Sequence, residues 1–408
     1  MSKRSSVEWI EDGGVTSPLG FVAGGTYAGL KTYGPEPRLD VGLLASETDC
    51  TVAGVFTKSR VPGAPVLVTR ERVRRGTARA IVANSGNSNV ATGEQGLRDA
   101  RRMAELAGAK LGIAPDDVLV ASTGVIGRHL PMTQVEPAIG RITTGRDGGG
   151  AFARAIMTTD TVMKSRALRV HAGDRVYTIG GAAKGSGMVH PDMATVLCFL
   201  TTDAPADSAW LQATLGKIAD DSLNMIDVDM DTSTSDMLLV LANGSAGGEP
   251  VRAGHPAAAA IARALREIAV AFARDLARDG EGARTLIEVV VEGARGRNDA
   301  RRAARTVASS PLVKTMVTGR DPNPGRVLMA LGRSGATLAV ERISVWIGEH
   351  CAFRAGAPTE VDYGVIKDAM NAPEVQIRAD LGLGKARATA WGCDLTEDYI
   401  RINASYTT

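Results

Sequence analysis

Residues 180–200 read GGAAKGSGMVHPDMATVLCFL, a run of small residues that leads into an apolar strand with a threonine at its head. Threonine is a weak nucleophile unless a base lies beside it, and its own α-amine can be that base when the threonine begins a chain. A peptide break between Ala194 and Thr195 would create this state. The same residues also fit a polar turn before an ordinary strand, so this stretch taken alone leaves both interpretations open.

The lysine in this stretch invites comparison with a phosphate-binding loop. The pattern GxxxxGK[ST] is not met, because Lys184 precedes Gly185 instead of following a glycine. A GxGxxG fingerprint is also absent from this segment. The glycines permit a close approach of the backbone to a neighbouring strand or to a substrate. A tight glycine turn with a solvated lysine is the alternative.

Outward from this stretch, helical and strand-like patterns alternate, which predicts an α/β protein of two or three domains for 408 residues. The spacing of apolar residues predicts helices over about 94–110, 151–157, 210–223 and 261–276. Residues 166–179 alternate like a hairpin. Apolar runs predict strands at 41–44, 51–57, 65–68, 80–83, 118–120, 237–242, 286–291, 327–331, 343–347, 375–379 and 386–391.

Charge and cysteine content argue against several classes of protein. The 47 Lys and Arg against 45 Asp and Glu leave a formal charge of +2, which gives no reason to expect a nucleic-acid or membrane-surface partner. Four cysteines lie far apart, which argues against a zinc ribbon or a disulfide scaffold and favours a reducing, cytosolic compartment. The first twelve residues lack the apolar segment of a signal peptide, and we expect no membrane span and no metal site.

Two further segments have polar groups suited to chemistry. Ser122-Thr123-Gly124 follows a predicted strand, where a hydroxyl and backbone N–H groups can stabilise an oxyanion; an ordinary polar turn is the alternative. The acid-rich residues 227–236 resemble a calcium loop, but Thr232 and Leu238 stand where an EF-hand needs Gly and Glu. This loop is therefore expected to bond its own backbone or to support a neighbouring site.

Taken together, the motifs resemble the ArgJ family of ornithine acetyltransferases, which has glutamate N-acetyltransferase activity. The core of the resemblance is residues 184–188 with 190–195. Further matching segments follow in order along nearly the whole chain: 84–87, 91–93, 122–127, 157–161, 231–234, 279–283, 310–315 and 403–408. Each motif is weak alone, and the ordered set is specific.

The resemblance implies a layered α/β sandwich of the self-processing DmpA/ArgJ-like type, with a second, smaller α/β region. It implies self-cleavage between Ala194 and Thr195. Residues 1–194 become the α chain and 195–408 the β chain, in which 195–280 completes the main domain and 281–408 forms the second region. The two chains stay together, commonly as an α2β2 assembly.

The resemblance also implies the reaction and its residues. Thr195 takes acetyl from N-acetylornithine and passes it to glutamate, without a cofactor. Thr123 and the backbone N–H of Gly124 match the oxyanion hole. Substrate-binding positions are matched by Thr158 (with Thr159 as the neighbouring alternative), Lys184, Thr195, Glu281, Asn403 and Thr408. The residues leave open whether acetyl-CoA is also a donor.

Two departures from the family pattern are present. The family usually continues 321–323 with Trp-Gly-Arg, and this chain has Pro324-Gly325-Arg326. Asp192 stands where the family usually has Asn, close to the scissile bond. The alternatives are an aminopeptidase of the same fold that passes the acyl group to water, an acetyltransferase of secondary metabolism with another acceptor, and an uncleaved binding protein.

Overall fold

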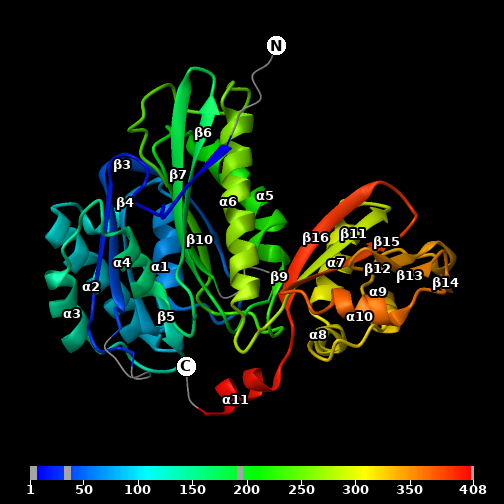
Figure 1. Cartoon of the computed structure of the whole chain (residues 1–408). Helices are drawn as coiled ribbons and strands as arrows, with labels where there is room; N and C mark the ends of the chain where they lie inside the picture. Colours follow the sequence, from blue (N-terminus) through cyan, green and yellow to red (C-terminus); the bar gives the residue numbers. More distant parts are fainter. Residues whose placement is uncertain (1–6, 32–37, 191–195, 406–408) are drawn as a thin grey trace.

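The computed structural model describes residues 7–31, 38–190 and 196–405 (Figure 1). Within them, one sheet has nine strands and another has seven. The first contains β1 (Val7–Ile10), β2 (Phe21–Thr26), β3 (Val41–Phe56), β4 (Thr77–Asn87), β5 (Val118–Val125), β6 (Lys164–Ala172), β7 (Arg175–Lys184), β8 (Leu197–Thr202) and β10 (Met237–Ala242). The second contains β9 (Ile226–Asp227), β11 (Leu286–Ala294), β12 (Ser344–Ile347), β13 (His350–Arg354), β14 (Ala357–Pro358), β15 (Glu374–Asp380) and β16 (Ala386–Cys393).

Helices cover both sheets, and the predicted layered α/β class is confirmed. The α-helices are α1 (Ala64–Val73), α2 (Gly93–Leu111), α3 (Met132–Arg141), α4 (Gly149–Ile156), α5 (Ser208–Asp221), α6 (Ala258–Arg278), α7 (Arg297–Ala308), α8 (Pro311–Thr318), α9 (Pro324–Gly332), α10 (Tyr363–Ala369) and α11 (Glu397–Ser405). Short 3-10 helices are η1 (Pro115–Asp117), η2 (Leu223–Met225) and η3 (Val340–Arg342).

The first sheet runs in the order β1-β6-β7-β8-β10-β3-β4-β5, and β2 pairs with the first half of β3. Helices α2 and α3 pack at the β3–β5 end, and α5 and α6 pack toward β3, β6 and β7. Alternate side chains of each strand point to opposite faces, so one face takes these helices and the other takes α4. Phe152 of α4 packs against Phe199 of β8, with ring centroids 5.6 Å apart.

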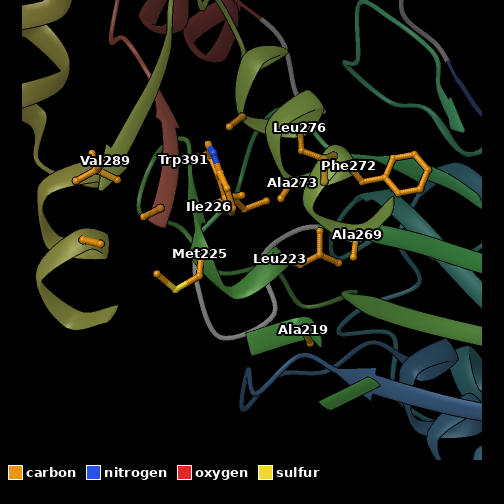
Figure 2. Packing of buried hydrophobic residues seen from close by; sticks show 14 of the residues in the cluster. Ala219, Leu223, Met225, Ile226, Ala269, Phe272, Ala273, Leu276, Val289 and Trp391 are labelled. Atoms are coloured by element: carbon orange, nitrogen blue, oxygen red, sulfur yellow. The ribbon is translucent and has the colours of Figure 1, made fainter. Parts of the chain in front are cut away.

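Helix α6 lies between the two sheets and joins them in one hydrophobic core (Figure 2). Its small residues Ala269 and Ala273 permit close packing, and Phe272 extends toward Gly181 of β7. Trp391 of β16 belongs to the same core. Because burial of apolar surface is the main source of stability, this shared core holds the second sheet against the first.

Two strand predictions are wrong, at residues 65–68 and 327–331. The first segment lies in α1 and the second in α9, and both helices have a proline in the first turn. Proline is favoured there because its fixed φ suits a helix and its missing N–H is not needed. An apolar run of four or five residues cannot by itself distinguish a strand from a buried helix.

Candidate active site

Six of the residues that the family resemblance implies for the site line one pocket. They are Thr123, Gly124, Thr158, Lys184, Glu281 and Asn403. They come from β5, the α4–β6 loop, the end of β7, the α6–β11 loop and α11, so the fold gathers them from most of the chain. Residues 233–235 of the acid-rich loop also line the pocket, as expected of a loop that supports a neighbouring site. Ala194, Thr195 and Thr408 lie outside the described residues.

The oxyanion-hole candidates lie at the carboxyl end of β5. Strand β5 runs parallel to β4, which places Thr123 beside Ser85 and Gly124 beside Gly86. Gly124 has φ of +126°, and a Cβ atom at this position would lie 2.4 Å from the carbonyl carbon of Gly86. A residue other than glycine would therefore force the two strand ends apart.

Lys184 ends β7 and is 2% exposed. Its Nζ donates a hydrogen bond to Thr123 Oγ1 at 3.2 Å. Burial lowers the pKa of Lys184 and the Lys164 ammonium lowers it further, while the carboxylates of Asp160 and Glu281 partly offset this effect. An ammonium has three donors, so Lys184 can also bind an anionic group in the pocket.

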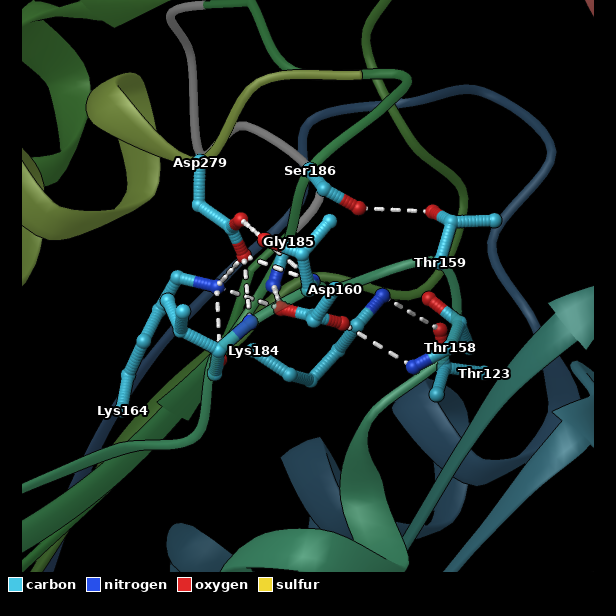
Figure 3. A network of polar contacts seen from close by, with 11 residues as sticks. Thr123, Thr158, Thr159, Asp160, Lys164, Lys184, Gly185, Ser186 and Asp279 are labelled. Carbon is cyan, nitrogen blue, oxygen red and sulfur yellow. Dashed lines mark hydrogen bonds and ion pairs between the residues drawn. The ribbon is translucent and has the colours of Figure 1, made fainter. Parts of the chain in front are cut away.

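A buried ion network lies beside Lys184 (Figure 3). Lys164 Nζ lies 2.7 Å from Asp160 Oδ1 and 2.5 Å from Asp279 Oδ2. Asp160 also accepts the backbone N–H of Gly185 at 2.7 Å. Burial raises the pKa of Asp160, but Lys164 and Lys184 outweigh this and hold it at about 2. The network therefore fixes the β7 end beside a permanent carboxylate.

The two adjacent threonines of the α4–β6 loop differ in their hydrogen bonds. The backbone N–H of Thr158 donates to Asp160 Oδ2 at 2.9 Å, and its hydroxyl bonds to no described residue. The Thr159 hydroxyl bonds to the Ser186 hydroxyl at 2.6 Å. Both line the pocket, but only the Thr158 hydroxyl is available to a ligand among the described residues, which favours Thr158 as the contact.

Glu281 reaches the same pocket from the loop after α6. Its backbone N–H donates to the Ser186 carbonyl at 2.8 Å, and its Oε2 accepts from Asn403 Nδ2 at 2.8 Å. A Cβ atom on Gly187 would lie 2.5 Å from the Glu281 carboxylate, so the absence of a side chain there makes room for this group. Asn403 therefore lies in the pocket as the group that orients Glu281.

The sequence did not single out Asp236, which bonds to Val196, the residue after the predicted nucleophile. Its Oδ1 accepts the backbone N–H of Val196 at 2.9 Å, and its Oδ2 is buried without a hydrogen bond to a described residue. Burial raises the pKa of Asp236 well above its ordinary value. In the sequence, Asp236 is marked only by its place in the acid-rich loop 227–236. An acid-rich composition is common in solvent-facing loops and does not by itself indicate a role.

The segment before the cleavage position is held by the same acid-rich loop. Asp229 accepts the backbone N–H groups of Met188 and Val189 at 2.6 and 2.9 Å, and burial raises its pKa to about 6. His190 Nδ1 lies 2.8 Å from Asp227 Oδ1. The loop therefore fixes the backbone up to the last described residue before the gap.

The described part of the chain contains no group of three or more His, Cys, Asp and Glu side chains placed to hold a metal ion. None of the helices described is long and apolar enough to cross a membrane.

Comparison with known proteins gives matches along nearly the whole chain. A model of the ArgJ family matches residues 22–408. The arginine biosynthesis bifunctional protein ArgJ of Symbiobacterium thermophilum is 51% identical over 404 residues, covering 98% of this chain and 100% of that protein. The protein of the same name from Dehalococcoides mccartyi is 45% identical over 406 residues, covering 99% and 100%. The solved ornithine acetyltransferase of Mycobacterium tuberculosis, complexed with ornithine, is 37% identical, covers 47% of this chain and 100% of that chain, and has a TM-score of 0.41.

Proposed function

This chain belongs to the ArgJ family, and we propose that it transfers the acetyl group of N2-acetyl-L-ornithine to L-glutamate in arginine biosynthesis. The observation that carries the proposal is the meeting of Thr123, Lys184 and Glu281 in one pocket. An amino-acid substrate has a carboxylate and an ammonium group. The pocket offers a buried cation for the first and a carboxylate for the second, and charge-assisted hydrogen bonds of this kind are the strong ones.

The nucleophile is Thr195, freed by cleavage of the Ala194–Thr195 bond. Residues 1–194 then form the α chain and 195–408 the β chain, with 195–280 completing the main domain and 281–408 forming the second region. The hydrogen bond from the Val196 N–H to Asp236 supports this proposal, because it fixes the backbone directly after the nucleophile. A fixed backbone limits the positions that the threonine side chain can occupy.

In the first half-reaction, the Thr195 α-amine takes the proton from Oγ while Oγ attacks the acetyl carbonyl carbon. The C–N bond of the acetyl amide breaks, the proton passes to the leaving nitrogen, and ornithine departs. The Thr123 hydroxyl and the Gly124 N–H stabilise the negative charge that forms on the carbonyl oxygen. Since Thr123 Oγ1 already accepts a hydrogen bond from Lys184, its own proton is free to be donated to that oxygen.

In the second half-reaction, the amine of glutamate attacks the acetyl-threonine ester. The C–O bond breaks, the proton returns to Thr195 Oγ, and N-acetylglutamate leaves. Lys184 binds the α-carboxylate of either substrate. Glu281, which Asn403 helps to orient, binds the side-chain ammonium of N-acetylornithine, whereas the single amine of glutamate is the attacking group. Thr158 and Thr408 supply further substrate contacts. The sequence of steps needs no cofactor.

Two partners extend this proposal. Acetyl-CoA is a second acetyl donor for glutamate, which the word "bifunctional" in the names of the relatives supports. The α and β chains of two precursors associate as an α2β2 assembly.

The test is an assay of the purified protein with N-acetylornithine and isotope-labelled glutamate, with products separated by mass spectrometry. The proposal predicts ornithine and labelled N-acetylglutamate in equal amounts, and none with Thr195→Ala. Ornithine and free acetate without N-acetylglutamate would instead establish hydrolysis, as in an aminopeptidase. Absence of turnover by an uncleaved chain would indicate a binding protein.

A further inference from the structure

We propose that a crevice between α6, α7 and β16 is a binding site for a small polyanion. The crevice has a volume of about 390 Å³ and shares no lining residue with the active-site pocket. Four arginines line it, from three different elements: Arg266, Arg297, Arg301 and Arg387. Its volume falls in the lower part of the range of small-molecule sites, roughly 300–1,000 Å³.

The positive charge of this crevice is only partly compensated. Asp221 pairs with Arg297 and lies 3.8 Å from Arg266 Nε, and Asp220 Oδ1 lies 3.2 Å from Arg301 Nη2. Four guanidinium groups face these two carboxylates, so two positive charges are in excess. Like charges held this close repel one another, and a bound anion removes that cost.

Two of the arginines have donors ready for a ligand. Arg301 Nε is buried and bonds to no described residue. Arg387 makes no ion pair or hydrogen bond with any part of the chain that the structure describes. A buried donor without an acceptor is costly, and in a native structure it is usually satisfied by water or a ligand. The crevice therefore offers one buried donor without an acceptor among the described residues, Arg301 Nε, and one exposed guanidinium, Arg387, without a protein partner among them.

The chemistry of the lining defines the class of ligand. Guanidinium groups bind phosphate and carboxylate oxygens in a bidentate manner, and several of them together favour multiply charged anions. The floor of the crevice is apolar and includes Met225, Val270 and Trp391, of which Met225 and Trp391 are shown in Figure 2. The occupant is thus a compact polyanion, either a di- or triphosphate or a polycarboxylate, with room for a non-polar part.

The test is isothermal titration calorimetry of the full, processed protein at 0.15 M salt. Pyrophosphate represents the phosphate source, citrate the carboxylate source and acetate a single charge. We expect saturable binding of pyrophosphate or citrate and none of acetate. Arg387→Gln should weaken that binding about tenfold, the loss expected for one charge-assisted hydrogen bond, with an unchanged melting temperature. Arg301→Gln should weaken it similarly.

Two controls make the result decisive. Arg333→Gln removes an exposed arginine elsewhere in the same region and should leave binding unchanged. Lys184→Met removes the cation of the active-site pocket and should also leave binding unchanged. The proposal is overturned if neither polyanion binds, if Arg387→Gln binds as tightly as the unaltered protein, or if Lys184→Met abolishes binding. Binding of only one polyanion supports the site and identifies its source.

Discussion

Lys184 and Lys314 are both 2% exposed, yet their environments shift the pKa values of their ammonium groups in opposite directions. Among the described residues, Lys184 Nζ donates one hydrogen bond, to the Thr123 hydroxyl. Lys314 Nζ contacts the carbonyls of Asp227 and Cys393 at 3.2 and 3.0 Å and Asp227 Oδ2 at 3.1 Å. Burial lowers the pKa of both lysines, but Cys393 and Asp227 outweigh it for Lys314, whose pKa is raised. Burial alone therefore does not determine the role of a lysine, whereas its partners do.

The largest expected effect of this difference is on catalysis. Lys314 Nζ donates to two backbone carbonyls, is ion-paired with Asp227 and lines no part of the active-site pocket, whereas Lys184 faces the pocket with donors to spare. We expect Lys184→Met to lower kcat/KM at least ~100-fold, the loss typical of removing one catalytic-site donor. Its melting temperature should stay close to that of the unaltered protein. Normal kinetics in this variant would remove Lys184 from the mechanism.

The opposite outcome is expected for Lys314. Lys314→Met leaves the buried carboxylate of Asp227 with His190 as its remaining side-chain partner, so unfolding should require roughly 3–5 kcal/mol less free energy. Urea denaturation measures this loss. The double variant Asp227→Asn/Lys314→Met should recover part of it, because position 227 then no longer buries a carboxylate without its lysine partner. Equal stability of the single variant and the unaltered protein would show that the ion pair is not structural.

The alkaline pH dependence of stability should separate the two lysines by sign. The pKa of Lys184 is lowered on folding, so above the folded-state pKa and up to 10.5 the unfolded chain binds more protons, and Lys184 makes stability rise with pH. The pKa of Lys314 is raised, so its contribution is complete below 10.5 and is lost as pH rises through the folded-state pKa. The free energy of unfolding of Lys184→Met and of Lys314→Met is measured over this pH range and compared with that of the unaltered protein. The difference isolates the contribution of each lysine. Slopes of the same sign would contradict the comparison.

The smallest expected effect concerns the group that orients the second charge of the pocket. Asn403→Ala removes one hydrogen bond to Glu281 Oε2, worth about 0.5–1.5 kcal/mol, and should raise KM for N-acetylornithine roughly two- to tenfold. The change should fall mainly on KM, because Asn403 acts through Glu281. Asn371→Ala, outside the pocket, serves as the matched control. A fall in kcat at unchanged KM would argue for a direct role of Asn403 in chemistry.

The sequence predicted the α/β class, and its resemblance to the ArgJ family pointed to six of the residues that line the pocket. It did not identify the buried ion network beside Lys184, because Lys164 and Asp279 are 115 positions apart and only the fold brings them together. The arginine crevice was missed for the same reason: its lining comes from helices and a strand that are distant in the chain. The helices at Pro65 and Pro324 were missed because short apolar runs carry no period.

The measurement that tests the account most directly is intact-mass analysis of the purified protein, before and after incubation with N-acetylornithine in the absence of glutamate. We expect two chains whose masses sum to about 42.5 kDa, the second beginning with Thr195. After incubation, only the second chain should be heavier, by one acetyl group, and glutamate should remove it. An uncut chain, or a cut protein that never holds acetyl on Thr195, would contradict the account.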